Sequence, residues 1–568
     1  MAALSDTSDF GDSSSDEGSE RDDPVSDMSD LDMDDDLSDH SFQSDTDSDD
    51  DPDTCSSMGT LGSQASSVDS DFWSDELKDV DTTDFTETAG PRHDLPPTAS
   101  VLMFFFLMFS DTFFSTMMEE TNRYAAQRQE THPDPDWYDT TIPEMMAFIG
   151  MQIMMGVVQV PNLGIYWSSN PFLGNAGFQR VMSRNRFQDL QRYFHLSDNT
   201  TQPPRGDPRY DRLNKVRPVI DMARANFRER YQPGQHQSVD EGMVKYKGQY
   251  FAKQYMPAKP VKRGFKIWMR CESSGYCGDF RPYLGKHDQF RGRDLGARVV
   301  LHLCRPLKWK GHHVYFDRFF TSIHLVQKLL ANGIFACGTI KATSAGIPAS
   351  MVAPTGLDRG DTVQCQHDDL VLTVWKDKKL VHVVSSGCHP VGDDPVVRRI
   401  PGGGAAEFNR PPTITQYQRY MGGVDRCMQH RAKNPVGRPA KKYWKYLLNF
   451  ILELCLINAF QVWKETPGAT ATKRTAYKLL DFRCDVATEL IGGFTTRKLP
   501  MRLTAPVHPA AVHTISRLDR KRSTCKWCTK HGEKRRRDTQ FGCSMCDVHL
   551  CQGACFTSYH DANHMASS

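Results

Sequence analysis

Three aspartates constrain the fold of this chain more than any other feature of its sequence. Asp240 and Asp317 each end a short apolar run, and Asp425 follows a pair of glycines. Basic residues crowd the sequence directly after the first acid, over 245–266. Carboxylate oxygens are the preferred ligands of hard cations such as Mg²⁺, and two such ions can hold the attacking and leaving oxygens of a phosphodiester. The pattern predicts a site that holds divalent cations against phosphate.

The net charge of −1 conceals a strong division of charge along the chain. Residues 1–98 contain 30 acidic and 3 basic residues and carry about −27, which leaves about +26 for the remainder. An acidic tail on a basic body indicates a nucleic-acid partner for the body. Residues 1–98 have too little apolar surface to offset the entropy of ordering, so we predict a disordered acidic tail. The residues leave open whether this tail is merely solvated or also masks the body when DNA is absent.

Cysteine usage and the length of the apolar runs predict the cellular compartment of the protein. The sequence opens with acids in place of the charged and apolar segments of a signal peptide. Its longest apolar run, 101–109, is too short to span a bilayer. Ten of the sixteen cysteines are scattered singly, and six lie within 525–555. We therefore expect no membrane partner and a reducing, intracellular protein whose clustered cysteines bind metal.

Hydrophobic spacing divides the body into a helical part and an α/β part. Residues 99–235 carry apolar residues at helical spacing with arginines between them, which fits either DNA docking or a helical bundle with a solvated face. Short β-rich runs follow. A capped helix near 321–330 between the runs 314–316 and 334–340 predicts a parallel strand pair with a crossover helix. Asp317 then lies at the carboxyl end of a strand, where open α/β sheets place their sites.

Residues 344–411 and 446–462 depart from the alternation of strands and helices in the α/β part. Residues 344–411 contain two strand-like runs and the glycines 402–404, which lack the lysine and serine or threonine of a phosphate-binding loop. We interpret 344–411 as an insertion within the α/β domain. Residues 446–462 predict a buried helix, and the polar residues within it argue against a membrane span.

The C-terminal residues carry the most specific local signal. Their spaced ligand pairs are Cys525 and Cys528, Cys543 and Cys546, Cys551 and Cys555, and His560 and His564. Eight such donors suffice for two tetrahedral zinc ions. We predict interleaved sites, the first and third pairs binding one ion and the second and fourth pairs the other, with His549 as a competing ligand. A basic run that includes Arg535 and Arg536 fits phosphate contact or a nuclear localisation signal.

Four ordered motifs resemble those of the piggyBac transposases and of the domesticated host proteins derived from them. They are SVDE at 238–241, KPxKxGxK at 259–266, FDRFFTS at 316–322 and YMGGVD at 420–425, followed by the cysteine-rich tail. The resemblance covers the chain from about residue 99 onward, and the acidic tail also fits. It implies a multidomain α/β fold with an RNase H-like catalytic domain split by an insertion. The implied segments are a disordered acidic tail (1–98), a helical dimerisation and DNA-binding domain (99–235 and 435–513), the RNase H-like domain (236–343 and 412–434), the insertion domain (344–411) and a zinc-binding cysteine-rich domain (519–568).

The resemblance also implies an activity and its residues. The family cuts and pastes DNA at TTAA targets through a hairpin on the transposon end, and its zinc-bearing tail reads transposon ends. By this resemblance Asp240, Asp317 and Asp425 would hold two Mg²⁺ ions for phosphodiester hydrolysis and strand transfer. The implied partners are double-stranded DNA and a second copy of the chain in a homodimer, and the expected location is the nucleus. The expected DNA contacts are Lys245, Lys262, Arg263, Arg438, Trp444, Arg535 and Arg536.

One position departs from the family pattern. The family commonly has a fourth aspartate three residues after the third acid, where this chain has Met428. Residues i and i+3 share a helix face, and a thioether is a poor ligand for Mg²⁺. Either Asp425 suffices and Met428 only packs, or activity is lost or weakened while DNA binding survives. The second case describes a catalytically impaired DNA-binding chromatin protein that keeps the fold and the zinc tail.

Overall fold

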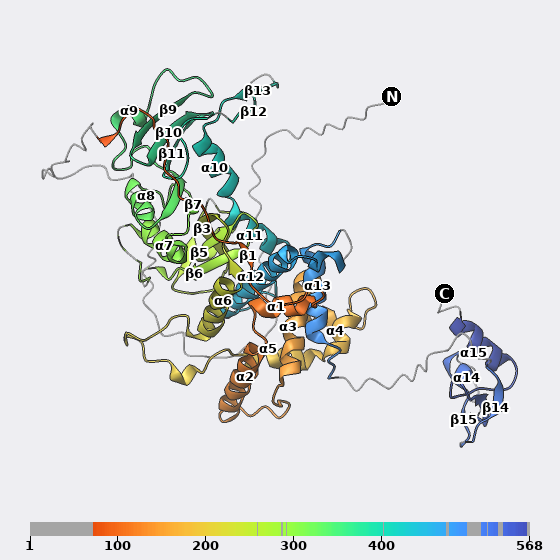
Figure 1. Ribbon diagram of the computed structural model, residues 1–568. Helices are drawn as coiled ribbons and strands as arrows, with labels where there is room; N and C mark the ends of the chain where they lie inside the picture. Colours follow the sequence, from red (N-terminus) through yellow and green to blue (C-terminus); the bar gives the residue numbers. More distant parts are fainter. Residues whose placement is uncertain are drawn as a thin grey trace, which may run out of the picture. The chain divides into compact units, whose positions relative to one another are not determined.

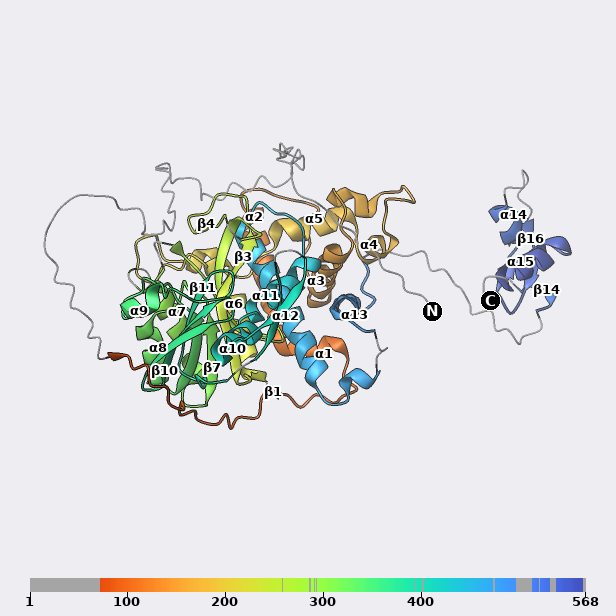
Figure 2. The ribbon, with the colours of Figure 1, turned by 90° about the horizontal axis from the view of Figure 1, so that it is seen from above.

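The computed structural model describes residues 72–257, 259–285, 288–290, 292, 294–392, 394–400, 403–472, 476–496, 513–519, 521–531 and 538–564. The chain divides into two compact units, Met1–Phe494 and Thr495–Ser568. Figure 1 and Figure 2 show their helices and strands from two sides.

A mixed sheet forms the centre of the first unit (Figure 1). In the described part of the chain its strands follow the order β4, β5, β3, β7, β8, β11, β10, β9, and β6 also pairs with β5. Strand β5 is antiparallel to both β3 and β6, whereas β7 is parallel to β3 and β8 is parallel to β7. The strand bounds are β3 His236–Lys245, β4 Lys253–Tyr255, β5 Arg263–Glu272, β6 Cys277–Pro282, β7 His312–Phe316, β8 Ile334–Thr339, β9 Thr362–His367, β10 Leu370–Lys376 and β11 Leu380–Ser385.

The crossover from β7 to β8 forms as its sequence predicts. Helix α8, Ile323–Leu330, begins after Ser322, whose side-chain oxygen accepts a hydrogen bond of 3.1 Å from the backbone N–H of Leu325. Gly333 then adopts a φ of +65°, a conformation that glycine reaches without steric cost, and β8 begins at the next residue. The parallel pairing of β7 with β8 confirms the predicted strand–helix–strand unit.

The segment 344–411 contributes three strands to this same sheet. Strand β11 pairs antiparallel with β8, and β10 and β9 follow it outward. A separate hairpin pairs β12, Val396–Arg399, with β13, Ala405–Phe408. Although 344–411 interrupts the sequence between the second and third acids, its main strands continue the central sheet.

Helices from both sides of the sheet segment in the sequence pack into one helical body. The early helices are α1 Val101–Met108, α2 Phe113–Gln129, α3 Ile142–Val157, α4 Ala176–Val181, α5 Arg184–Tyr193 and α6 Arg217–Glu229, and the late ones are α12 Tyr443–Glu465 and α13 Leu479–Ile491. Helix α13 packs on α3, and α12 packs on α1 and α6. Helix α12 is long and apolar enough to cross a membrane, but 83% of its apolar window is buried inside the fold.

Residues 72–98 correct the prediction of a disordered tail that extends to residue 98. The indole N–H of Trp73 donates a hydrogen bond of 2.8 Å to the carbonyl of Gly346, and Val80 is only 2% exposed. Strand β1, Gly90–Pro91, pairs with β2, Tyr231–Gln232. The few apolar residues of this acid-rich segment are enough to hold it along the fold, so the composition of the whole segment misled the prediction. Residues 1–71 lie outside the described residues.

Close packing sets the position of α11, Gly423–Lys433, which carries the third acid. Helix α11 packs against β3 and β5. A Cβ atom at Gly423 would lie 2.4 Å from the carbonyl oxygen of Glu272 and 2.5 Å from Oγ of Ser238. Only glycine allows this approach, whereas the neighbouring Gly422 has open space around its own Cβ position.

We predict that Gly423→Ala moves α11 away from the sheet and lowers the free energy of unfolding by about 1–3 kcal/mol, as overpacking of an interior contact does. Gly422→Ala is the matched control and should cost less, because its methyl group meets no atom. Chemical denaturation of the two variants beside the natural protein measures the difference. Equal stability of both variants would contradict the close approach at Gly423.

Candidate functional site

The fold brings the three predicted acids to one place. Parallel strands β3 and β7 pair Val239 with Phe316, so Asp240 and Asp317 each follow by one residue at neighbouring positions. Asp425 lies in the first turn of α11, which packs on β3 and β5 (Figure 1). The acids are far apart in sequence, and strand register and helix packing unite them.

Lys259 links these carboxylates. Its Nζ lies 2.9 Å from Oε1 of Glu241 and 3.8 Å from Oδ1 of Asp240. Burial lowers the pKa of Lys259, but Asp240 and Glu241, with a further contribution from Asp425, raise that pKa above its ordinary value. Glu241 and Lys259 are site residues that our sequence reasoning did not single out. Both residues belong to the motifs given above. Alternation along a strand predicts that the side chain of Glu241 faces away from that of Asp240. Lys259 reaches Asp240 and Glu241 because the loop before β5 brings it there, which the sequence does not reveal.

The carboxylates are held in an environment that disfavours their negative charge. Asp240 is 7% exposed, and burial together with the charge of Glu241 raises its pKa to about 8, although Lys259 opposes this effect. Burial and Glu241 also raise the pKa of Asp317, while the backbone N–H of Phe319 and the charge of Lys259 lower it. A bound cation would relieve this repulsion. The donor set, carboxylate oxygens from two strands and a helix, therefore fits a hard divalent cation.

Met428 occupies the position one turn beyond Asp425. Its Sδ would lie 2.9 Å from a Cβ atom at Gly242, and Sδ of Met269 would lie 2.8 Å from the same point. The two thioethers thus fill the space over Gly242, which lies two residues beyond Asp240 on the same face of β3. Met428 is partly buried against the main apolar core. Met428 therefore makes packing contacts in the structure, and both alternatives considered for this residue are compatible with them.

Three of the predicted DNA contacts lie on the surface of the first unit. Lys245 ends β3, and Lys262 and Arg263 lie at the start of β5, and all three side chains are exposed. The guanidinium of Arg263 lies over the ring of Tyr255, 5.2 Å from its centroid. Because these three cationic side chains are exposed, they are accessible to a phosphate group. Arg535 and Arg536 lie outside the described residues.

Arg438 and Trp444 are placed differently from the expectation. The guanidinium of Arg438 donates hydrogen bonds of 2.6 and 2.9 Å to the carbonyls of Val160 and Pro161, which ties two segments of the helical body together. Trp444 is 1% exposed and stacks on Phe194. Its proposed role as a DNA contact therefore needs correction: its indole is a core side chain of α12.

The second unit gathers cysteine and histidine donors into two clusters. Cys525, Cys528, Cys551 and Cys555 form one, with their ligand atoms all within 4.8 Å of one another. This is the first set that the sequence predicts. Sγ of Cys528 and Sγ of Cys555 are 3.5 Å apart, close to the separation of two sulfurs bound about 2.3 Å from a tetrahedral zinc ion. The backbone N–H of Cys551 donates to Sγ of Cys525, which would orient that thiolate.

The second cluster has a different fourth ligand from the one expected. It contains Cys543, Cys546 and His560, as predicted, together with His513. Nδ1 of His513 lies 3.3 Å from Sγ of Cys546, and Nε2 of His560 lies 3.5 Å from the same sulfur. His560 Nδ1 donates to the carbonyl of Phe556, which leaves Nε2 free to bind metal. The side chain of His564 lies outside the described residues, and His549 belongs to neither cluster.

Family models match most of the chain. Residues 102–460 match the family described as Transposase IS4, and residues 508–561 match the DDE_Tnp_1-like zinc finger. Curated proteins that match include human PiggyBac transposable element-derived proteins 2, 5 and 3. This chain belongs to the piggyBac transposase family. The zinc-finger match includes His513 and ends before His564, in agreement with the second cluster.

Relatives and a solved structure extend this assignment. The chain is 29% identical to human PiggyBac transposable element-derived protein 2, over 63% of this chain and 60% of that protein. It is 26% identical to human PiggyBac transposable element-derived protein 5, over 74% of this chain and 81% of that protein. A cryo-EM structure of a piggyBac transposase synaptic complex with hairpin DNA matches with a TM-score of 0.62 at 23% identity, over 83% of this chain and all of that one. This likeness shows that the piggyBac fold is shared.

We predict that the buried charge of Asp240 makes its own replacement stabilising. Because the folded-state pKa lies near 8, above the usual value of about 3.9, the ionised carboxylate lowers stability as pH rises. The gain of Asp240→Asn over the natural protein should grow between about pH 4 and 8, by up to ~1.4 kcal/mol per pH unit. Melting temperatures across this range, without added Mg²⁺, measure it. Asp221→Asn, at an exposed position of α6, is the control, and a gain that does not grow with pH would contradict the shift.

A second prediction separates the two candidate histidines of the zinc domain. His513→Ala should reduce the zinc content of the purified protein from two ions per chain to about one, because it removes a ligand of the second cluster. His564→Ala should retain two. Zinc is quantified by elemental analysis after dialysis. The opposite pattern, loss with His564→Ala alone, would restore the ligand set expected from the sequence.

Proposed function

We propose that this protein is a DNA transposase of the piggyBac type, or a recent descendant of one, with the three aspartates as its catalytic acids. The observation that carries the proposal is the convergence of Asp240, Asp317 and Asp425 around Lys259 from two strands and a helix. Family membership supplies the reaction class. The activity would be phosphodiester hydrolysis and strand transfer on double-stranded DNA at TTAA targets.

The order of the central strands supports an RNase H-like reading of the catalytic domain. An antiparallel set of β6, β5 and β3 continues into β7 and β8, which run parallel to β3. Asp240 lies within β3, and Asp317 directly follows the parallel strand β7. Asp425 lies on α11, which follows the segment 344–411 in the sequence. On this proposal, 236–343 and 412–434 form one split domain.

The residues of the site have separable roles in this chemistry. Two Mg²⁺ ions, when bound, would activate the attacking oxygen and stabilise the leaving oxygen. Asp240 and Asp317 would hold them from the sheet and Asp425 from α11. Lys259 offsets the charge of Asp240 and Glu241 before metal binds, and its ammonium would then bind a phosphate oxygen. Lys245, Lys262 and Arg263 would bind the DNA backbone as exposed cations.

The remaining assignments rest on family membership and on charge. The +26 body would bind duplex DNA with a steep dependence on salt, because each neutralised phosphate releases counterions. The zinc domain would read transposon ends, a second copy of the chain would complete a homodimer, and the protein would act in the nucleus. Each of these is part of the proposal.

Met428 favours a second candidate, a DNA-binding chromatin protein that keeps the fold but cleaves weakly or not at all. A thioether packed against Gly242 and Met269 supplies no oxygen ligand near Asp425. Water could fill the vacant ligand position, so the loss of cleavage need not be complete. The three intact aspartates favour an active enzyme, whereas Met428 favours a protein that is impaired in DNA cleavage.

We predict that the natural protein excises DNA weakly and that Met428→Asp raises excision by about tenfold or more, since it restores an oxygen ligand. Met428→Asn is the matched control: it has the shape of aspartate without its charge and should gain much less. Asp317→Asn should abolish whatever cleavage remains. The measurement is excision of a substrate bearing the element's own terminal repeats, with binding to the same ends measured in parallel.

Retained DNA binding in all four proteins would separate a chemical effect from loss of fold. Robust excision by the natural protein, unimproved by Met428→Asp, would show that three acids suffice. Excision that persists in Asp317→Asn would contradict the assignment of the site itself.

A further inference from the structure

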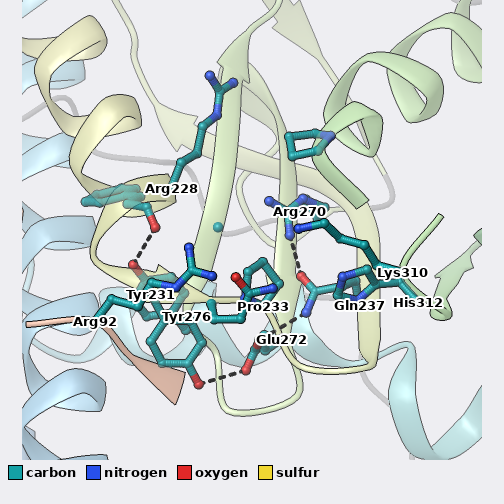
Figure 3. A pocket seen from close by; sticks show the side chains of 14 residues that line it. Arg92, Arg228, Tyr231, Pro233, Gln237, Arg270, Glu272, Tyr276, Lys310 and His312 are labelled. Carbon is teal, nitrogen blue, oxygen red and sulfur yellow. Dashed lines mark hydrogen bonds between the residues drawn. The ribbon is translucent and has the colours of Figure 1, made fainter. Parts of the chain in front are cut away.

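A basic pocket lies beside the beginning of β3, where Gln237 precedes Asp240 by three residues (Figure 3). Its cavity volume is about 130 Å³. Arg92 lines it from one side and Arg270, Lys310 and His312 line the other, whereas the guanidinium of Arg228 points away from them (Figure 3). Gln237 and Glu272 form part of its wall. In antiparallel pairing these two lie on the face of the sheet away from Asp240, so the pocket is separate from the carboxylate site.

Arg270 is the central observation. It is 1% exposed, and an arginine stays charged in a protein. Its Nε donates to the carbonyl of Leu303 and its Nη1 to Oε1 of Gln237, and neither partner carries a negative charge. Among the described residues, Nη2 has no hydrogen-bond partner and no carboxylate forms an ion pair with the guanidinium. A buried cation with only neutral partners costs free energy that a bound anion would offset.

The acids around the pocket are already engaged. Glu272 lines it, but Oε1 accepts hydrogen bonds from Gly234 and Gln237, and Oε2 accepts one from Tyr231. Outside the lining, Asp279 pairs with Arg224 and Arg228, and Glu87 pairs with Lys310. Two of the four cationic side chains in the lining, Arg228 and Lys310, therefore have acidic partners outside it, which leaves Arg92 and Arg270 against the one carboxylate of Glu272. The excess of positive charge points to an anionic ligand.

His312 adds a second, independent signal. Its side chain is fully buried, its Nδ1 lies 3.0 Å from the carbonyl of Gly234, and its Nε2 has no partner among the described residues. Since a carbonyl can only accept, Nδ1 carries the proton. Burial, with the charges of Arg270 and Lys310, lowers the pKa of His312 to about 4, so the ring is neutral at pH 7. Nε2 therefore offers a lone pair to a ligand that carries a hydroxyl group.

Size restricts the ligand further. The cavity is several times the roughly 30 Å³ that a water molecule takes in the liquid, but smaller than the roughly 300–1,000 Å³ pockets that hold drug-sized ligands. It has room for a tetrahedral oxyanion and lacks room for a nucleoside. Arg92 and Arg228 are exposed at the mouth, where a substituent on that oxyanion could leave the pocket.

We propose that this pocket binds a phosphate group, as inorganic phosphate or as the terminal phosphate of a monoester. Arg270 and Arg92 donate to its unprotonated oxygens, and Nε2 of His312 accepts from its hydroxyl. The site is independent of the proposed transposase reaction. Sulfate is of similar size and shape but has no hydroxyl at pH 7, so the pocket should discriminate against it. A monoester, whose second pKa is about 6, carries a hydroxyl at pH 7 only in its minor monoanionic form, so inorganic phosphate should bind more tightly than the monoester.

The test uses the full-length protein without added divalent cation at pH 7 and constant ionic strength. Titration calorimetry and melting temperature follow the addition of sodium phosphate, with sodium sulfate and sodium chloride as comparisons. We expect saturable binding of phosphate and at least tenfold weaker binding of sulfate. O-phosphoserine amide is the monoester probe. The anion that binds more tightly, phosphate or monoester, identifies the source of the ligand.

Variants locate the binding. Arg92→Gln, at the exposed mouth, should weaken phosphate binding about tenfold, because it removes a charge-assisted hydrogen bond. Arg209→Gln is the matched control, since Arg209 is exposed and pairs with Asp207 away from the pocket lining. His312→Gln should reduce the preference for phosphate over sulfate. The proposal is overturned if neither phosphate nor the monoester binds more tightly than chloride, if sulfate binds as tightly as phosphate, or if Arg92→Gln matches the control.

Discussion

Carboxylates that lie close together in a buried site repel one another, and the arrangement of this protein depends on how that repulsion is offset. Asp240, Asp317 and Glu241 all experience burial, and the negative neighbours raise the pKa of the first two. The fold holds them together by the pairing of β3 with β7 and by the approach of α11 to the sheet at Gly423. Lys259 supplies an ammonium that contacts both Asp240 and Glu241. A site built in this way is prepared for a further cation.

The same sheet separates a site that suits cations from a site that suits an anion. Residues that alternate along β3 place Asp240 on the face that α11 covers and Gln237 on the other. On the first face the protein gathers negative charge, which suits cations. On the other face, Arg270 is buried among neutral partners, which suits an anion. Met428 departs from this division of charge. It places an apolar side chain on the same face of α11 as the carboxylate of Asp425.

Local patterns in the sequence predicted much of this arrangement. Asp317 could be placed at a strand end because Ser322 and Gly333 mark the limits of the next helix, and the cysteine spacing identified three pairs of ligands. Contacts over long sequence distances could not be predicted in this way. His513 stands apart from the spaced pairs, Lys259 reaches Glu241 only through a loop, and the burial of Trp444 depends on Phe194 from another helix. Average composition likewise concealed the few apolar residues that order 72–98.

The central claim is that Asp240, Asp317 and Asp425 form one cation site. Anomalous diffraction from crystals soaked in Mn²⁺, an ion with similar preference for carboxylate oxygen, tests it directly. The account predicts an anomalous peak bounded by the three carboxylates, with the ammonium of Lys259 displaced from Asp240. A map with no peak between these carboxylates at saturating Mn²⁺, while the zinc clusters of the second unit show theirs, would contradict it.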